Sequence, residues 1–308
     1  MVKTKMHKVH WMIVTLVAAL ILSSCAQVEP GENQTAPSIT VGSKDFTEEF
    51  IVAEMYAHLL ENAGFEVNRS LNLGGTPVAH SAILSGDIDL YPEYTSTALL
   101  TVLNMEPIRD REQIVQTVRS EYEEQFNLTW LEPAPFNNTQ ALAMTQEKSD
   151  RFAIQTFSDL AAQAQNLVLG GPAEFIERED GLRALQQTYG GFQFQEVRQL
   201  GTGSLRYQAL VDGQIDVVVA FGTDGQIDGL NLVLLEDDQD LYPVYQIAPV
   251  VRLDALEENP QIADILNPLA PLLTNEVMSG LNWQVDGPEK KEPAEVAQDF
   301  LQQNGLLE

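Results

Sequence analysis

From Ile39 onward, short blocks of alternating apolar and polar residues each lead into a segment with a helical period. Ile39 and Val41 predict a short strand, because apolar side chains recur at every second residue of a half-buried strand. A helix is predicted next, ending before Gly64, from apolar residues at helical spacing: Phe46, Phe50, Ala53, Ala57 and Leu60. A strand at 65–67, a helix at 78–84 and a strand at 88–90 follow. Strands that alternate with helices indicate an α/β fold with parallel strands.

The stretch DIDLYPEYTSTAL, residues 87–99, carries the first candidate for a binding site. Its predicted strand, 88–90, leads into tyrosines, a glutamate and threonines before a helical run begins. In open α/β sheets, ligands bind in the crevice beyond the carboxyl ends of the strands. These polar and aromatic residues are therefore candidates for ligand contact. The alternative is a purely structural helix start with Thr95 as its N-cap.

An internal repeat appears when the chain is shifted by 127 residues. AGFEV at 63–67 then falls on GGFQF at 190–194, and SAILSGDIDL at 81–90 falls on QALVDGQIDV at 208–217. Leu73-Gly74 falls on Leu200-Gly201, and the strand at 39–41 on residues 166–168. The repeat predicts two similar α/β lobes whose strands point into a shared cleft. The alternative is that helix–strand units of similar size resemble one another generically.

The repeat also places individual residues. Tyr94 falls on Phe221, so we expect both at equivalent strand ends, one from each lobe. A strand that ends at Gly170-Gly171-Pro172 precedes a helix start, which could hold an anion. Chain crossings between the lobes are predicted at 130–144 and 242–251, and two crossings make a hinge. The helical tail, 253–308, is expected to pack on the first lobe.

The N-terminal segment indicates export. Basic residues precede an apolar run at 11–22 that is too short to span a bilayer comfortably, and Leu22-Ser23-Ser24-Cys25 follows. This is the layout of a lipoprotein signal peptide over 1–25, with Cys25 lipidated; the alternative is an ordinary signal with an accidental cysteine. A polar tether is expected over 26–38. Lobe 1 would comprise 39–140 and 247–308, and lobe 2 would comprise 141–246.

Composition excludes several functions. The formal net charge of −28 argues against nucleic acid, whose phosphates require lysine and arginine. A single cysteine leaves no disulfide framework, and His58 and His80 have no partner at metal-ligand spacing. Neither a phosphate-binding loop nor a nucleophile motif of known enzymes is present. We therefore expect neither catalysis nor a metal or cofactor.

Seven motifs, in order, make the chain resemble the substrate-binding proteins of ABC importers for osmoprotectants such as glycine betaine, choline and carnitine. The motifs are GSKDFTE at 42–48, LGGT at 73–76, GDIDLYPEYTSTAL at 86–99, FNNT at 136–139, EFIEREDG at 174–181, TDG at 223–225 and the segment from Tyr242 to Arg252. The resemblance covers essentially the whole chain after the signal segment. It implies a two-lobed, type II periplasmic-binding-protein fold that closes around its solute.

The resemblance also implies a site. A quaternary ammonium has no N–H to donate, so aromatic faces hold it by cation–π attraction. The implied cage positions are Tyr94, Gln140, Phe221 and Tyr245, with Asn138 in support. A ligand carboxylate would meet Lys44, Thr97 and Arg178. The implied partners are the solute, a permease with its ATPase, and the membrane through the lipid anchor; we expect a monomer outside the cytoplasmic membrane.

Two cage positions depart from the family pattern, which has tyrosine at both. Phe221 keeps the aromatic face, whereas Gln140 replaces it with an amide. Losing a face should weaken binding of a bare trimethylammonium by roughly 0.5–2 kcal/mol, or favour a ligand with an N–H or hydroxyl near its cation. The rival functions are an amino-acid or other polar-solute receptor and a sensory receptor domain.

Several residues also have structural interpretations. Lys44 could be a surface lysine, Arg178 could pair with Glu174 or Asp180, and Tyr245 could be core near the hinge. Tyr91 is expected to pack inside the lobe. Arg206 and Tyr207 are interpreted as helix surface or lobe packing.

Overall fold

The computed structural model describes residues 36–307, of which Pro37 onward belong to one compact unit. The predicted signal peptide, Cys25 and most of the predicted tether lie outside the described residues. Within 36–307, no helix has both the length and the apolar character needed to cross a membrane.

The first of two five-stranded sheets has the order β2-β1-β3-β10-β4. Its strands are β1 (Ser38–Gly42), β2 (Glu66–Ser70), β3 (Leu90–Tyr94), β4 (Leu128–Trp130) and β10 (Ile247–Arg252). β1 pairs in parallel with β2 and β3, whereas β10 runs antiparallel to β3 and β4. The parallel core that the sequence predicts is therefore extended by an antiparallel strand from late in the chain.

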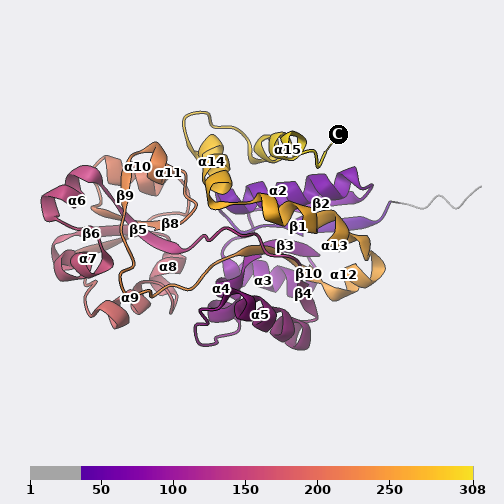
Figure 1. Ribbon diagram of the computed structural model, residues 1–308, viewed down its shortest axis with the longest axis horizontal. Coiled ribbons are helices and arrows are strands. Elements are labelled where there is room, and N and C mark those ends of the chain that lie inside the picture. The colour runs from indigo at the N-terminus through magenta and orange to yellow at the C-terminus, as the bar shows by residue number, and fades with distance from the viewer. Residues whose placement is uncertain (1–35, 308) are drawn as a thin grey trace, which may run out of the picture. The chain divides into compact units, whose positions relative to one another are not determined.

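Helices cover both faces of this sheet, and together they form the first lobe (Figure 1). One face carries α2 (Thr47–Asn62), α13 (Gln261–Leu266), η3 (Asn267–Leu272), α14 (Asn275–Asp286) and α15 (Pro293–Gln303). The other carries α3 (Thr76–Ser85), the π-helical turn η1 (Ala98–Val102) and α5 (Arg111–Phe126). The short α4 (Thr95–Thr97) lies between β3 and η1, and α12 (Leu253–Glu258) follows β10, with Leu256 packed against the core under α2. Alternate residues of β3 serve the two faces: Leu90 packs under α2 and Tyr91 packs toward α5.

The second sheet, β7-β6-β8-β5-β9, repeats the architecture and with its helices forms the second lobe. Its strands are β5 (Gln140–Thr145), β6 (Val168–Gly171), β7 (Glu196–Gln199), β8 (Val217–Phe221) and β9 (Leu232–Leu234). Its helices are α6 (Gln146–Phe152), α7 (Phe157–Gln163), η2 (Ala164–Asn166), α8 (Ala173–Glu177), α9 (Leu182–Tyr189), α10 (Leu205–Val211) and α11 (Gln226–Gly229).

The two sheets correspond strand by strand, as the 127-residue repeat predicts. Tyr94 is the last residue of β3 and pairs with Ile247, while Phe221 is the last residue of β8 and pairs with Gln140. Two segments, 131–139 and 235–246, carry the chain between the sheets (Figure 1). The predicted crossing at 130–144 is thus divided: Trp130 ends a strand of one sheet and Gln140 begins a strand of the other.

One local expectation is corrected, and two alternatives that the sequence left open are decided. The strand predicted at 88–90 begins at Leu90 and runs through Tyr94, because β10 supplies an antiparallel partner for residues 90–94. Thr95 is not an N-cap; its hydroxyl accepts the Gln246 N–H, at 3.2 Å, and so fixes a crossing segment. Arg206 is not on the surface: only 2% of it is exposed, and its guanidinium donates to the Val219 carbonyl and to Asp224.

Candidate functional site

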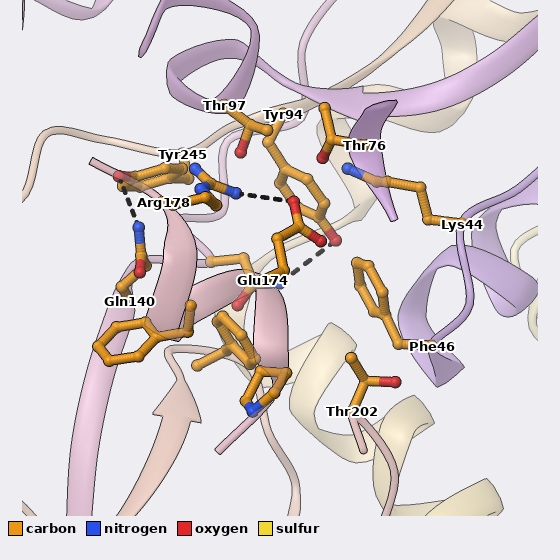
Figure 2. A pocket seen from close by; sticks show the side chains of 14 residues that line it. Lys44, Phe46, Thr76, Tyr94, Thr97, Gln140, Glu174, Arg178, Thr202 and Tyr245 are labelled. Carbon is orange, nitrogen blue, oxygen red and sulfur yellow. Dashed lines mark hydrogen bonds and ion pairs between the residues drawn. The ribbon is translucent and has the colours of Figure 1, made fainter. Parts of the chain in front are cut away.

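A pocket of about 610 Å³, partly open to solvent, lies where strand ends of the two sheets meet (Figure 2). All eight residues that the sequence nominated line it: Lys44, Tyr94, Thr97, Asn138, Gln140, Arg178, Phe221 and Tyr245. They come from the segment after β1, the end of β3, α4, the crossing segments, β5, the end of α8 and the end of β8. Sequence analysis missed six more lining residues: Phe46, Thr76, Pro172, Glu174, Phe175 and Thr202.

Tyr94 forms a fixed aromatic wall in the first lobe. Only 4% of it is exposed, and its ring stacks near Phe46 with 6.2 Å between ring centroids. Its hydroxyl donates to Glu48, at 2.6 Å, and accepts from the Asn138 side chain, at 3.2 Å. Tyr91, by contrast, is fully buried in the core and donates to Glu93, which confirms that it packs inside.

Lys44 is a buried, ion-paired lysine and not a surface one. Its ammonium lies 2.5 Å from a Glu93 oxygen and 3.5 Å from a Glu49 oxygen, and 4.7 Å from the centre of the Tyr94 ring. Burial by itself lowers the pKa of Lys44, but attraction to Glu93 and Glu49 outweighs it and raises that pKa above its usual value. Burial also raises the pKa of Glu49 to about 8. Lys44 therefore stays charged and balances the negative charge of the buried carboxylates beside it.

Arg178, Gln140 and Tyr245 form a polar corner of the pocket, on the side away from Lys44 (Figure 2). Asp180, which does not line the pocket, accepts a hydrogen bond from each of the three. The Arg178 guanidinium lies 2.5 Å from an Asp180 oxygen and 3.3 Å from a Glu174 oxygen, which is the ion pairing that the sequence left as an alternative. The Gln140 amide donates to Asp180, at 2.9 Å, and to the Tyr245 hydroxyl, at 3.2 Å. Tyr245 belongs both to the core of the first lobe and to the pocket wall.

Glu174 reaches from α8 of the second lobe to the start of α3 in the first. A Cβ at Gly75, the residue before α3, would lie only 2.7 Å from a Glu174 oxygen, so the carboxylate closely approaches the backbone there. Glu174 also stands in the first turn of α8, the helix start that the sequence suggested for an anion. Glu174 therefore stands near the starts of both helices, and a carboxylate is the charge that helix N-termini favour.

Four of the six missed residues lie inside the quoted family motifs, which are the signal that could have found them: Phe46, Thr76, Glu174 and Phe175. Asp180 and Glu174 lie in the EFIERED motif beside Arg178, where spacing alone suggests ordinary surface pairing. Phe46 has the helical period of a core residue. Only the position of the following strands and crossings brings Phe46 and Glu174 to the pocket. Within residues 36–307, no set of three or more histidine, cysteine or carboxylate side chains could hold a metal ion.

Comparison with known proteins gives one consistent result. The sequence profile of the family described as "Substrate binding domain of ABC-type glycine betaine transport system" matches residues 37–303. The "Ergothioneine transport permease/ergothioneine binding protein" of Helicobacter pylori is 36% identical over 93% of this chain, which spans about half (51%) of that relative. The "Carnitine transport binding protein" of Listeria monocytogenes is 34% identical, with 96% of each sequence covered.

Structural comparison agrees with these sequence matches. A crystal structure titled "glycine betaine/carnitine/choline ABC transporter" superimposes with a TM-score of 0.71 and 28% identity, covering 88% of this chain and all of the other. The two sheets with flanking helices therefore match the two-lobed periplasmic-binding-protein architecture that the sequence predicts.

Proposed function

Because this chain belongs to the family of substrate-binding domains of ABC-type glycine betaine transport systems, we propose that it captures a zwitterionic quaternary amine in the pocket between its lobes and delivers it to a permease. Proteins of this family are solute receptors and not enzymes, and they act outside the cytoplasmic membrane. The observation that carries the proposal is the convergence of the Tyr94, Phe221 and Tyr245 rings on one pocket.

The charges around the pocket also favour a ligand cation. Lys44 and Arg178 each have a carboxylate of the chain at 2.5 Å, so the pocket wall has no excess of positive charge, although both side chains have further N–H donors. Glu174 adds a negative charge to the wall. A trimethylammonium group cannot donate a hydrogen bond, so it gains most from aromatic faces and a nearby anion. The ligand's carboxylate would reach Thr97, Lys44 and Arg178, while Asn138 supports the cage through Tyr94.

Titration calorimetry of the purified protein tests this proposal. Glycine betaine, choline and carnitine should release or absorb heat on binding, and tetramethylammonium should compete weakly as the bare cation. Tert-butylacetate, which has the shape of glycine betaine without the positive charge, is the matched control and should not bind. Absence of binding by every quaternary amine, or equal binding of tert-butylacetate, would contradict the proposal.

A second candidate ligand is a quaternary amine with an additional hydrogen-bonding group, such as ergothioneine. The observation that favours it is Gln140, whose amide stands in the wall next to Asp180 where an aromatic face would otherwise be expected. A ring N–H could hydrogen-bond in this corner. Gln140→Leu should then weaken ergothioneine binding by about tenfold while changing glycine betaine binding by less than about twofold. Equal changes for both ligands would remove Gln140 from the selection of the ligand.

We also propose that Cys25 carries a lipid that holds the protein at the outer face of the cytoplasmic membrane. The support is the short apolar run, Leu22-Ser23-Ser24 and the cysteine that follows it. Cys25→Ser should release the protein from the membrane fraction and abolish labelling by a radioactive fatty acid. Ser24→Ala, which keeps a small residue, is the control and should leave both unchanged.

A further inference from the structure

Glu48, near the start of α2, is a buried carboxylate directly behind the pocket wall. Only 3% of it is exposed, and it does not line the pocket itself. No lysine, arginine or histidine among residues 36–307 forms an ion pair with it. A buried charge is costly unless hydrogen bonds replace its lost water. The partners of Glu48 must therefore account for its presence.

Four side-chain donors converge on the two oxygens of Glu48. Oε1 accepts from the Tyr94 hydroxyl, at 2.6 Å, and from the Asn138 amide, at 2.8 Å. Oε2 accepts from the Thr223 hydroxyl, at 2.5 Å, and from the Asn282 amide, at 2.9 Å. Burial raises the pKa of Glu48, and the hydrogen bonds from Thr223, Tyr94 and Asn282 oppose that rise. Every donor thus matches the ionised carboxylate.

The two oxygens face different parts of the molecule. The donors to Oε1, Tyr94 and Asn138, both line the pocket. The donors to Oε2 do not: Thr223 follows β8 of the second lobe, and Asn282 lies in α14. The Asn282 amide also donates to the Thr223 carbonyl, at 2.9 Å. One carboxylate therefore joins the aromatic wall of the first lobe to the second lobe.

Further contacts between the lobes surround this carboxylate. The Thr202 hydroxyl of the second lobe donates to the Asp45 carbonyl, at 2.9 Å. The Gln226 amide of α11 donates to Asp286 of α14, at 2.9 Å, and α14 lies against α11 (Figure 1). These other links join a neutral donor to a backbone carbonyl or to the half-buried Asp286. Glu48 is the buried carboxylate among them, so separation of the lobes would cost its Oε2 the hydrogen bond from Thr223.

We propose that Glu48 is a positioning residue that couples closure of the lobes to assembly of the aromatic wall. One oxygen fixes the Tyr94 ring through its hydroxyl, and the other holds the second lobe through Thr223. The closed arrangement and the binding-ready Tyr94 then form together. The inference rests on the proposed function for the solute, but the lobe contact it describes does not depend on which solute binds.

The test compares Thr223→Val, Glu48→Gln and the double variant. Thr223→Val removes one hydroxyl outside the pocket and should weaken solute binding by about tenfold, mainly through faster dissociation. In the Glu48→Gln background the same substitution should have almost no further effect, because residues that act through one contact are not additive. Thr129→Val is the matched control: the Thr129 hydroxyl donates to Glu123 at 2.5 Å, and neither residue lines the pocket.

A readout without solute separates this inference from the proposed function. In Cys25→Ser protein labelled with a dye pair at Ser81→Cys and Gln208→Cys, on exposed positions of α3 and α10, energy transfer reports the separation of the lobes. Thr223→Val and Glu48→Gln should shift molecules toward the low-transfer population, and Thr129→Val should not. If the wild type binds no quaternary amine, the proposed function fails while this measurement still decides on Glu48. Unchanged energy transfer and binding within about twofold of wild type would overturn the inference.

Discussion

Tyr94 ends β3 and Phe221 ends β8, and the two rings meet the same pocket from opposite lobes. The Tyr94 ring is buried, stacked near Phe46 and tied by its hydroxyl to Glu48 and Asn138. Phe221 is only half-buried and has no hydroxyl to tie. The repeat thus supplies two rings at equivalent positions: the Tyr94 ring is buried and anchored by its hydroxyl, whereas the half-buried Phe221 ring is held by packing against the second-lobe core alone.

Each ring has a cation of its own lobe behind it, in a different setting. The Lys44 ammonium lies 4.7 Å from the centre of the Tyr94 ring and also lines the pocket. The Arg206 guanidinium lies 5.6 Å from the centre of the Phe221 ring, outside the pocket lining, and pairs with Asp224. Of the two cations behind the rings, only Lys44 therefore lines the pocket, whereas Arg206 does not; the pocket-lining cation of the second lobe is Arg178.

The first lobe thus presents a preorganised wall, Tyr94, and the second lobe an adjustable one, Phe221. A preorganised wall loses less conformational entropy when the solute binds, so truncating it should reduce the affinity for the solute by more. An adjustable wall can follow ligands of different size. The difference predicts unequal effects of truncating two residues at equivalent positions in their lobes.

Tyr94→Ala is the substitution with the largest expected effect. It removes a desolvated aromatic face and leaves Glu48 and Asn138 without their partner, so affinity for the solute should fall by at least about thirtyfold. Tyr94→Phe keeps the face and loses only the hydroxyl, so it should lose about tenfold or less. Calorimetry gives the affinities, and thermal unfolding checks that each variant folds. Binding of Tyr94→Ala at wild-type strength would remove Tyr94 from the cage.

Phe221→Ala should have a smaller effect, a loss of about three- to tenfold, because the adjustable ring contributes a face with less preorganisation. Phe221→Tyr restores the hydroxyl of the family pattern and should stay within about twofold of wild type, since the half-buried ring leaves the new group near solvent. The same titrations measure both. A loss as large as that of Tyr94→Ala would refute the claim that the two walls differ in constraint.

Much of this architecture could be predicted because the sequence has periodic patterns of apolar residues that indicate its strands and helices. The alternation around Ile39, the helical period from Phe46 and the 127-residue repeat are local or nearly local signals, and they placed Tyr94 and Phe221 at matching strand ends. The family motifs then predicted that Lys44, Arg178 and Tyr245 lie in the same pocket. In each case a short segment carries its own information about where the side chain lies.

The remainder depends on contacts between distant segments. β3 extends to Tyr94 because β10, more than 150 positions later, pairs with it. Glu48 looks like an ordinary acidic residue in the first turn of a helix, and only the folded chain brings Thr223 and Asn282 to its second oxygen. For Arg206 the sequence left surface and lobe packing both open, because its partners, Asp224 and the Val219 carbonyl, do not lie on its own helix. Buried polar networks of this kind join residues that are distant in the sequence, so they produce no periodic pattern that could predict them.

The smallest expected effect concerns the buried charges of the first lobe, which has two carboxylates around Lys44 where the second lobe pairs Arg206 with Asp224 alone. Burial raises the pKa of Glu49 to about 8, so the folded chain keeps this proton well above the ordinary value of 4.5 at which the unfolded chain loses it. Between these values the folded state binds more protons, and the contribution of Glu49 to stability must fall as pH rises.

Glu49→Gln imitates the protonated side chain and should flatten that part of the pH dependence. Urea unfolding at about pH 5 and about pH 9 should show a smaller loss of stability for Glu49→Gln than for wild type, because glutamine has no proton to release. The exposed Glu124→Gln is the control for a change in net charge and should keep the wild-type difference. If Glu49→Gln also keeps that difference, the extra proton does not reside on Glu49, and Lys44 balances both carboxylates in their ionised form. The first lobe would then tolerate a buried net negative charge beside the pocket, which would strengthen its attraction for a cationic solute.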